Sequence, residues 1–108
     1  TRVPINACLR LLASCDGGEV TTAEGLGTPD EPHVVQSALA LADGSQCGFC
    51  SPGMVAAIVS LLEQQEAKAE PQPTAGGGSA QARRRGTPAV SALEMEEALD
   101  GNLCRCTG

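Results

Sequence analysis

The chain has 108 residues, a formal net charge of −6 at neutral pH, six cysteines, and Phe49 as its one aromatic residue. This length provides one small domain, or parts of two, with a limited core. The acidic balance argues against nucleic acid as a partner, and no stretch reaches the roughly 18 apolar residues that are needed to span a bilayer.

Residues 1–27 have the pattern of short strands joined by a turn. Val3, Ile5 and Ala7 alternate with polar neighbours, residues 16–18 carry a turn signal, and residues 20–22 are β-prone. Two such segments cannot form a sheet with a core of its own. We therefore expect that partner strands lie outside this sequence.

Three helices are predicted in the remainder of the chain, and the first covers about residues 32–43. Thr28 or Asp30 is expected as its N-cap, Pro32 lies in its first turn, and Gly44 follows its end. Apolar residues recur at helical spacing in the first two helices, so we expect them to face the core. They are Val34, Val35, Ala38, Leu39 and Ala42 in the first helix, and Met54, Val55, Ile58, Val59, Leu61 and Leu62 in the second.

The second and third helices have clear terminal signals. The second begins with Ser51 as N-cap and Pro52 as its first helical residue. The third begins at a capping box of Ser91 and Glu94, and it ends at Gly101, which suits a left-handed position. Residues 66–90 lie between these helices, lack an apolar pattern and are predicted to form a flexible loop. The basic run 83–85 within them is interpreted as solvated rather than as a contact for an acidic partner.

The cysteine content and the ends of the sequence set further expectations. Residues 1–4 do not resemble a signal peptide, and six cysteines without a secretory signal indicate metal-binding or redox residues rather than disulfides. We therefore expect a cytosolic protein. Because the sequence begins without methionine and stops directly after a cysteine motif, we also expect a fragment of something longer.

Four of the cysteines form two short motifs flanked by glycine. Cys47 and Cys50 form a C-x-x-C motif directly before the second helix, whose N-terminal N–H groups favour thiolates. Cys104 and Cys106 form a C-x-C motif after the third helix, with Arg105 between them to offset negative charge. Zn²⁺ and a [2Fe–2S] cluster both take four thiolates. The spacing alone leaves both open, and four reduced cysteines without metal are a third interpretation.

Longer strings around these motifs resemble a known family. Residues 46–53 (QCGFCSPG) and residues 101–108 (GNLCRCTG) closely resemble the iron–sulfur region of the xanthine dehydrogenase/aldehyde oxidase family of molybdenum hydroxylases. Residues 6–9, 21–27 and 33–36 are similar to further segments of that family. The resemblance covers nearly the whole chain except about residues 66–90.

The resemblance implies a mainly α fold with two domains and two clusters. Residues 1–27 are expected to be the C-terminal remnant of a plant-type [2Fe–2S] ferredoxin-like domain, including its last strands. Residues 28–108 are expected to be a helical [2Fe–2S]-binding bundle that lacks its last helix and carries an insertion at about 66–90. The second cluster is expected in this bundle, and its ligands would be Cys47, Cys50, Cys104 and Cys106.

Single residues outside this set also receive expected roles. By the resemblance, Cys8 is the fourth ligand of the first cluster, whose other three ligands are absent from this sequence. Gln46 matches a residue that hydrogen-bonds the pterin in the family. Cys15 matches no ligand position, so we expect a free thiol there. His33 is interpreted as a helix-start or packing residue rather than a ligand or proton carrier.

The function that the resemblance implies is electron transfer inside an oxidoreductase. The chain would be the iron–sulfur portion of a molybdenum hydroxylase of the xanthine dehydrogenase/aldehyde oxidase type, and it would relay electrons from the molybdenum centre towards FAD. Its partners would be the molybdopterin and FAD domains of a homodimeric parent enzyme, and the chain alone would not oxidise substrate. The alternative is a zinc-stabilised four-cysteine interaction module without redox activity.

Overall fold

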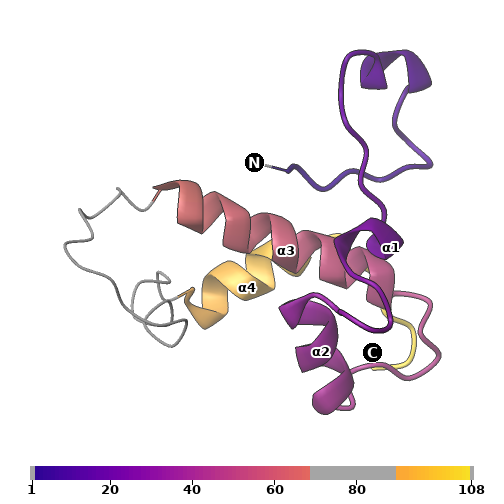
Figure 1. Ribbon diagram of the computed structural model, residues 1–108. Helices are drawn as coiled ribbons and strands as arrows, with labels where there is room; N and C mark the ends of the chain where they lie inside the picture. The colour runs from indigo at the N-terminus through magenta and orange to yellow at the C-terminus, as the bar shows by residue number, and fades with distance from the viewer. Residues whose placement is uncertain (1, 69–89, 108) are drawn as a thin grey trace.

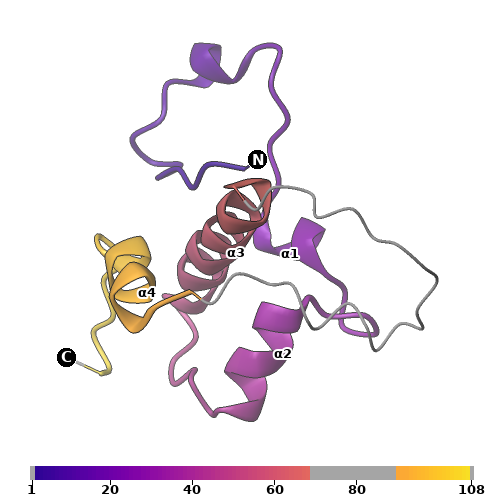
Figure 2. The same cartoon turned by 90° about the vertical axis from the view of Figure 1, so that its left-hand side faces the viewer.

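The computed structural model describes residues 2–68 and 90–107. These residues contain a short 3₁₀ helix η1 (Leu12–Cys15) and the helices α1 (Ala23–Leu26), α2 (Val34–Leu41), α3 (Ser51–Lys68) and α4 (Ala92–Leu99). α3 is the central element and contacts the other three α-helices. Figures 1 and 2 show α4 along one side of α3, with α1 and α2 on the other side. The expected mainly α architecture is confirmed for the described residues.

A small apolar core lies between α3 and the helices α1 and α2. Val35 of α2 and Val55 and Val59 of α3 are buried. Four partly buried side chains pack against them, and these are Leu26, Leu39, Ile58 and Leu62. The second helix therefore places its predicted stripe largely as expected. α4 contributes no fully buried residue to this core, and it packs along α3 through half-buried side chains.

The start of α2 differs from the prediction. His33 is the N-cap: its Nδ1 accepts from the N–H of Val35 at 3.2 Å, and its own N–H donates to Gln36 Oε1 at 2.7 Å. The expected caps were wrong because Thr28 is used earlier, where its hydroxyl accepts from the N–H of Glu31 at 3.1 Å. This shifts the helix start from residue 32 to Val34.

The apolar stripe expected along α2 is only partly correct. Val35 and Leu39 face the core, whereas Val34, Ala38 and Ala42 are exposed. One short helix presents about one row of side chains to α3, so residues on the neighbouring rows remain in solvent. α2 ends at Leu41, two residues before the predicted end at 43, and the left-handed residue after its C-cap is Asp43 (φ 49°) rather than Gly44.

α3 begins one residue earlier than predicted. The carbonyl of Cys50 accepts from the N–H of Met54 at 3.1 Å, so Cys50 is the N-cap and Ser51 is already helical. The Ser51 hydroxyl pairs with the hydroxyl of Ser45 at 2.7 Å instead of capping the helix. At the other end α3 runs to Lys68, so residues 66–68 of the predicted loop are helical. The rest of that prediction, residues 69–89, lies outside the described residues.

The ends of α4 are as predicted. The Ser91 hydroxyl accepts from the N–H of Glu94 at 3.2 Å, and the Glu94 carboxylate accepts from the N–H of Ser91 at 2.8 Å. This capping box satisfies two N-terminal donors at once. Gly101 follows the helix with φ 85°, a left-handed conformation that glycine adopts without a steric penalty.

The strands expected over residues 1–27 are not confirmed. In the described residues of that segment the chain forms turns, η1 and α1, without a strand. A strand needs a hydrogen-bonded neighbour, and extended residues such as Val3 have none in the described part of the chain. The segment is tied to α3 by an ion pair between Arg2 and Glu63 and by the Ser60 hydroxyl, which donates to the carbonyl of Arg2 at 2.6 Å.

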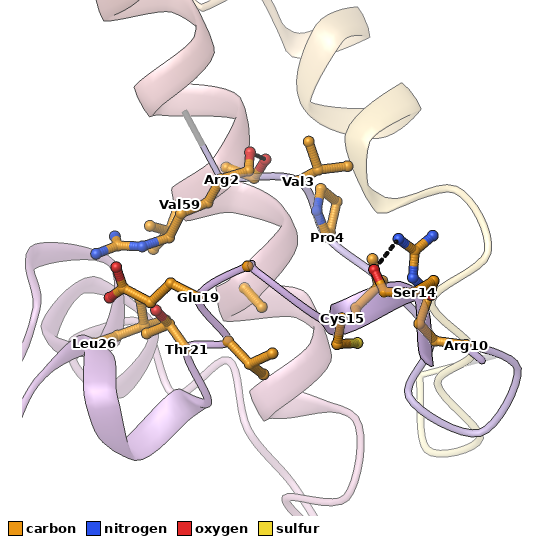
Figure 3. Close-up of a pocket in the computed structure, with 15 residues that line it drawn as sticks. Arg2, Val3, Pro4, Arg10, Ser14, Cys15, Glu19, Thr21, Leu26 and Val59 are labelled. Carbon is orange, nitrogen blue, oxygen red and sulfur yellow. Dashed lines mark hydrogen bonds between the residues drawn. The ribbon is translucent and has the colours of Figure 1, made fainter. Parts of the chain in front are cut away.

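A cavity of about 560 Å³ lies between this N-terminal segment and α3. Figure 3 shows Cys15 and Val59 among its lining residues, together with Arg10, which donates to the carbonyl of Ser14. Cys15 is a free thiol, as expected. None of the helices described here is both long enough and apolar enough to cross a membrane.

Candidate metal centre

The first cysteine motif occupies the turn between α2 and α3. Gly48 has φ 82°, and a Cβ at this position would meet only the Ser45 hydroxyl, at 3.8 Å. The backbone conformation therefore favours glycine here, because L-residues rarely adopt it. The carbonyl of Gly48 accepts from the N–H of Ser51 at 3.3 Å, which closes the turn. It places Cys47 just before α3 and Cys50 at its N-cap.

The second motif follows α4 and returns to the start of α3. The N–H of Asn102 donates to the carbonyl of Leu99 at 2.9 Å, which turns the chain after Gly101. The Asn102 side chain then lies against Gly53, because a Cβ on that glycine would be 2.9 Å from Asn102 Oδ1. The two motifs, far apart in the sequence, thus meet at one end of the helix pair.

The four thiols interact in two pairs, each with one member from each motif. Cys47 interacts with Cys106, and Cys50 interacts with Cys104. Cys50 and Cys104 are half-buried, whereas Cys47 and Cys106 are exposed. We call these residues the four-cysteine site. The structure therefore brings the two cysteine motifs close to each other, while their joint ligation of one centre stays a prediction.

Local donors stabilise a thiolate in each pair. The pKa of the Cys104 thiol is lowered to about 7 by the hydroxyl and N–H of Thr107, by the N–H of Cys106 and by the Cys50 thiol. The pKa of Cys47 is lowered by the N–H of Phe49 and then by the Cys106 thiol. Because thiolates are the form that binds metal, these donors prepare both pairs for a metal centre.

Cys50 is shifted in the opposite direction. Its pKa is raised, first because its thiol interacts with Cys104 and second by burial. Between Cys50 and Cys104, Cys104 is thus the better anion and Cys50 the better hydrogen-bond donor. A bound cation would stabilise both sulfurs as thiolates.

The donor set fits a soft metal centre. Four thiolates suit both zinc and iron–sulfur clusters, and a [2Fe–2S] cluster takes four cysteines. Among residues 2–68 and 90–107, no three His, Cys, Asp or Glu side chains are already gathered around one point. The geometry therefore leaves a single zinc ion and a [2Fe–2S] cluster open.

The remaining predicted residues lie outside these pairs. Gln46 is exposed next to Cys47, and nothing in the structure tests its contact with a pterin. Cys8 is exposed in the N-terminal segment, where its N–H donates to Asn6 Oδ1 at 3.0 Å. Figures 1 and 2 show that this segment extends away from the C-terminal end of the chain. His33 is the α2 cap, which confirms its interpretation as a helix-start residue.

Three residues of the site were missed from the sequence. Thr107 supports the thiolate of Cys104, and Gly53 and Asn102 bring the two motifs together. A threonine directly after a C-x-C motif is a weak signal for a sulfur hydrogen bond. The contact between Gly53 and Asn102 has no local signal, because it joins residues that are distant in the sequence.

Comparisons with known proteins agree with this chemistry. Residues 22–108 match the model of a family described as "[2Fe-2S] binding domain". The chain is 42% identical over 104 residues to a xanthine dehydrogenase of Emericella nidulans, and 40% identical over 104 residues to a xanthine dehydrogenase/oxidase of Rattus norvegicus. It is 38% identical over 102 residues to an aldehyde oxidoreductase iron–sulfur-binding subunit of Escherichia coli.

These similarities cover nearly all of this chain but only part of each relative. Each of the two dehydrogenase matches covers 96% of this chain but only 6% of the relative. The match to the bacterial subunit covers 94% of this chain and 42% of the relative. The chain thus spans a small part of the two dehydrogenases and less than half of the bacterial subunit.

Proposed function

This chain belongs to the [2Fe-2S] binding domain family, and from that premise we propose that the four-cysteine site holds one [2Fe–2S] cluster that transfers single electrons. The observation that carries the proposal is that the two cysteine motifs meet at the start of α3, where Asn102 lies against Gly53. Cys47, Cys50, Cys104 and Cys106 would hold the cluster.

The protein contributes position and charge stabilisation, whereas the cluster supplies the one-electron redox chemistry. The N–H groups of Phe49, Cys106 and Thr107 and the Thr107 hydroxyl point their positive ends at ligand sulfurs. Such donors stabilise negative charge on the sulfurs and so favour the reduced state. Cys50 at the α3 N-cap adds the partial positive charge of the helix terminus.

The larger role that we propose is that of an electron relay in an oxidoreductase of the xanthine dehydrogenase/aldehyde oxidase type. Support comes from the names of the relatives, one of which is an iron–sulfur-binding subunit. In this role the chain would hold a cluster that supplies one-electron transfer between a molybdopterin centre and FAD, in a homodimeric parent enzyme. The chain itself holds no substrate site in this proposal. The proposed compartment is the cytosol, where thiols stay reduced.

Residue-level and domain-level parts of this proposal follow from the same resemblance. Residues 1–27 would belong to a neighbouring ferredoxin-like domain, with Cys8 as a ligand of its cluster, and residues 28–108 to the helical domain. Gln46 would contact the pterin. Its exposure beside Cys47 leaves it accessible to a partner domain, which supports this role.

The decisive experiment is anaerobic reconstitution of the chain with iron and sulfide. We expect two irons and two sulfides per chain, and a visible absorption that dithionite bleaches. Cys104→Ser removes one thiolate ligand and should lower the retained iron at least ten-fold. Cys15→Ser, which changes a free thiol outside the site, should retain the wild-type spectrum. A colourless protein with one zinc per chain would overturn the proposal.

A further inference from the structure

The C-terminal helix α4, whose end leads into the second cysteine motif, packs along α3. None of its residues is buried, and the apolar core cluster draws only on α1, α2 and α3. The half-buried residues of α4, among them Met95 and Leu99, pack along α3. Specific contacts at the two ends of the helix pair then fix where the segment with Cys104 and Cys106 lies.

Two such contacts lie at opposite ends of the α3–α4 pair. At one end, Gln65 near the C-terminus of α3 donates to the Glu94 carboxylate near the start of α4 at 2.8 Å. At the other end, Gly53 in the first turn of α3 meets Asn102 beyond the end of α4. The helices are thus antiparallel. The second contact is the one beside the cysteines, only three residues from Cys50 and two from Cys104.

The presence of glycine at position 53 is explained by this contact. Glycine inside a helix costs about 1 kcal/mol relative to alanine, and Gly53 has no positive φ that would require it. An alanine methyl group there would lie 2.9 Å from Asn102 Oδ1, closer than such atoms approach. The missing side chain therefore creates the space in which Asn102 lies over the α3 N-terminus, where exposed N–H groups favour an oxygen.

We propose that Asn102 is a positioning residue of the metal centre, and that Gly53 is its required receptor. Together they hold the segment of the second cysteine motif against the first, so that each thiol meets its partner from the other motif. This inference rests on the proposed function in one respect: the positioned sulfurs are those that we assign to the cluster. No role in binding a substrate is implied.

The test is a double-mutant cycle on the reconstituted chain. Gly53→Ala and Asn102→Ala should each increase the rate of cluster loss to a chelator about ten-fold, the usual cost of losing a group that orients metal ligands. The double variant should be no more than about two-fold worse than Asn102→Ala, because the added methyl group fills the space that Asn102 left. Leu103→Ala, at a neighbouring position that is 90% exposed, should retain the wild-type rate.

A conservative variant separates positioning from general destabilisation. Asn102→Asp keeps the shape and the oxygen but adds negative charge near the cluster. We expect it to retain the cluster and to lower the midpoint potential, because negative charge disfavours the reduced state. Wild-type cluster retention in Gly53→Ala, or additive effects in the double variant, would overturn the inference.

The same variants test the inference if the proposed cluster does not form. In the metal-free chain, mild oxidation followed by peptide mapping measures how fast a disulfide joins Cys50 to Cys104. Gly53→Ala should slow this cross-motif reaction about ten-fold, and the double variant should be no more than about two-fold slower than Asn102→Ala. Absence of cluster in the wild type counts against the proposed function, whereas an unchanged cross-linking rate in Gly53→Ala counts against the positioning contact.

Discussion

At the scale of single residues, His33 shows how one side chain can fix the start of a helix. Its Nδ1 accepts from the N–H of Val35, one of the first N–H groups of α2 that have no partner within the helix. Gln36 completes the box and also donates to the carbonyl of Ala23 at 3.1 Å. The capping box therefore satisfies N–H groups at the start of α2 and also links α2 to α1.

We expect His33→Ala to lower the free energy of unfolding by about 1 kcal/mol, the usual cost of losing an N-cap. His33→Asn should retain most of the stability, because asparagine is a strong N-cap. Urea unfolding of the reconstituted chain measures both values. The visible spectrum of the cluster should be unchanged in both variants. Altered iron ligation in His33→Ala would contradict the assignment of His33 as a cap.

This cap also illustrates what residue patterns can and cannot predict. The end signals of α4 were predicted correctly because Ser91, Glu94 and Gly101 act within the helix itself. The α2 cap was missed because Thr28 and Asp30 are stronger cap residues by type, yet Thr28 had a competing local turn.

At the scale of elements, α4 shows how one carboxylate can both cap a helix and attach it to its neighbour. The pKa of the Glu94 carboxyl is lowered, first by the N–H of Ser91, then by the Ser91 hydroxyl, with smaller contributions from Gln65 and Lys68. The same carboxylate therefore caps α4 and joins it to α3. Its charge state should control how firmly this helix is attached.

The pH dependence follows from the direction of that shift. Because the folded pKa of Glu94 lies below its ordinary value of 4.5, the charged carboxylate stabilises α4 above this value, and the stabilisation is lost as the pH falls through the folded pKa. Amide chemical shifts of α4 in the metal-free chain report this loss. Glu94→Gln keeps the box without the charge, so its α4 shifts should not follow this titration. An identical titration in both proteins would refute the role of Glu94.

The arrangement of elements was predicted less completely than their existence. The helical spacing of α3 indicated its buried face, whereas the strands of residues 1–27 are not confirmed, since strand formation depends on neighbours that a local pattern does not describe. The pairing of Cys47 with Cys106 was also beyond sequence reasoning. It depends on how α4 turns back along α3, which Gly53 and Asn102 determine through space.

At the scale of the whole molecule, the described residues share a very small core. The buried apolar side chains are Val35, Val55, Ala57 and Val59. Several large apolar side chains remain exposed, among them Phe49 at 92%. A metal centre that joins the start of α3 to the end of α4 would therefore supply much of the cooperativity of folding.

Removal of the metal should consequently destabilise the whole chain. We expect chelation under reducing conditions to lower the melting temperature by more than about 10 °C and to broaden the transition, because the small core alone supports little stability. Circular dichroism during heating measures the change. Addition of iron and sulfide should restore the original transition. An unchanged melting curve after complete iron loss would show that the fold does not depend on the centre.

The position of Cys50 has a consequence for natural sequence variation. Its backbone carbonyl begins α3, and serine is among the best residues for that position. A serine variant at residue 50 would thus still start α3, but it would remove one thiolate ligand and with it the stability that the centre supplies. A polymorphism at this codon would therefore preserve the helix start and still lower both the iron content and the melting temperature.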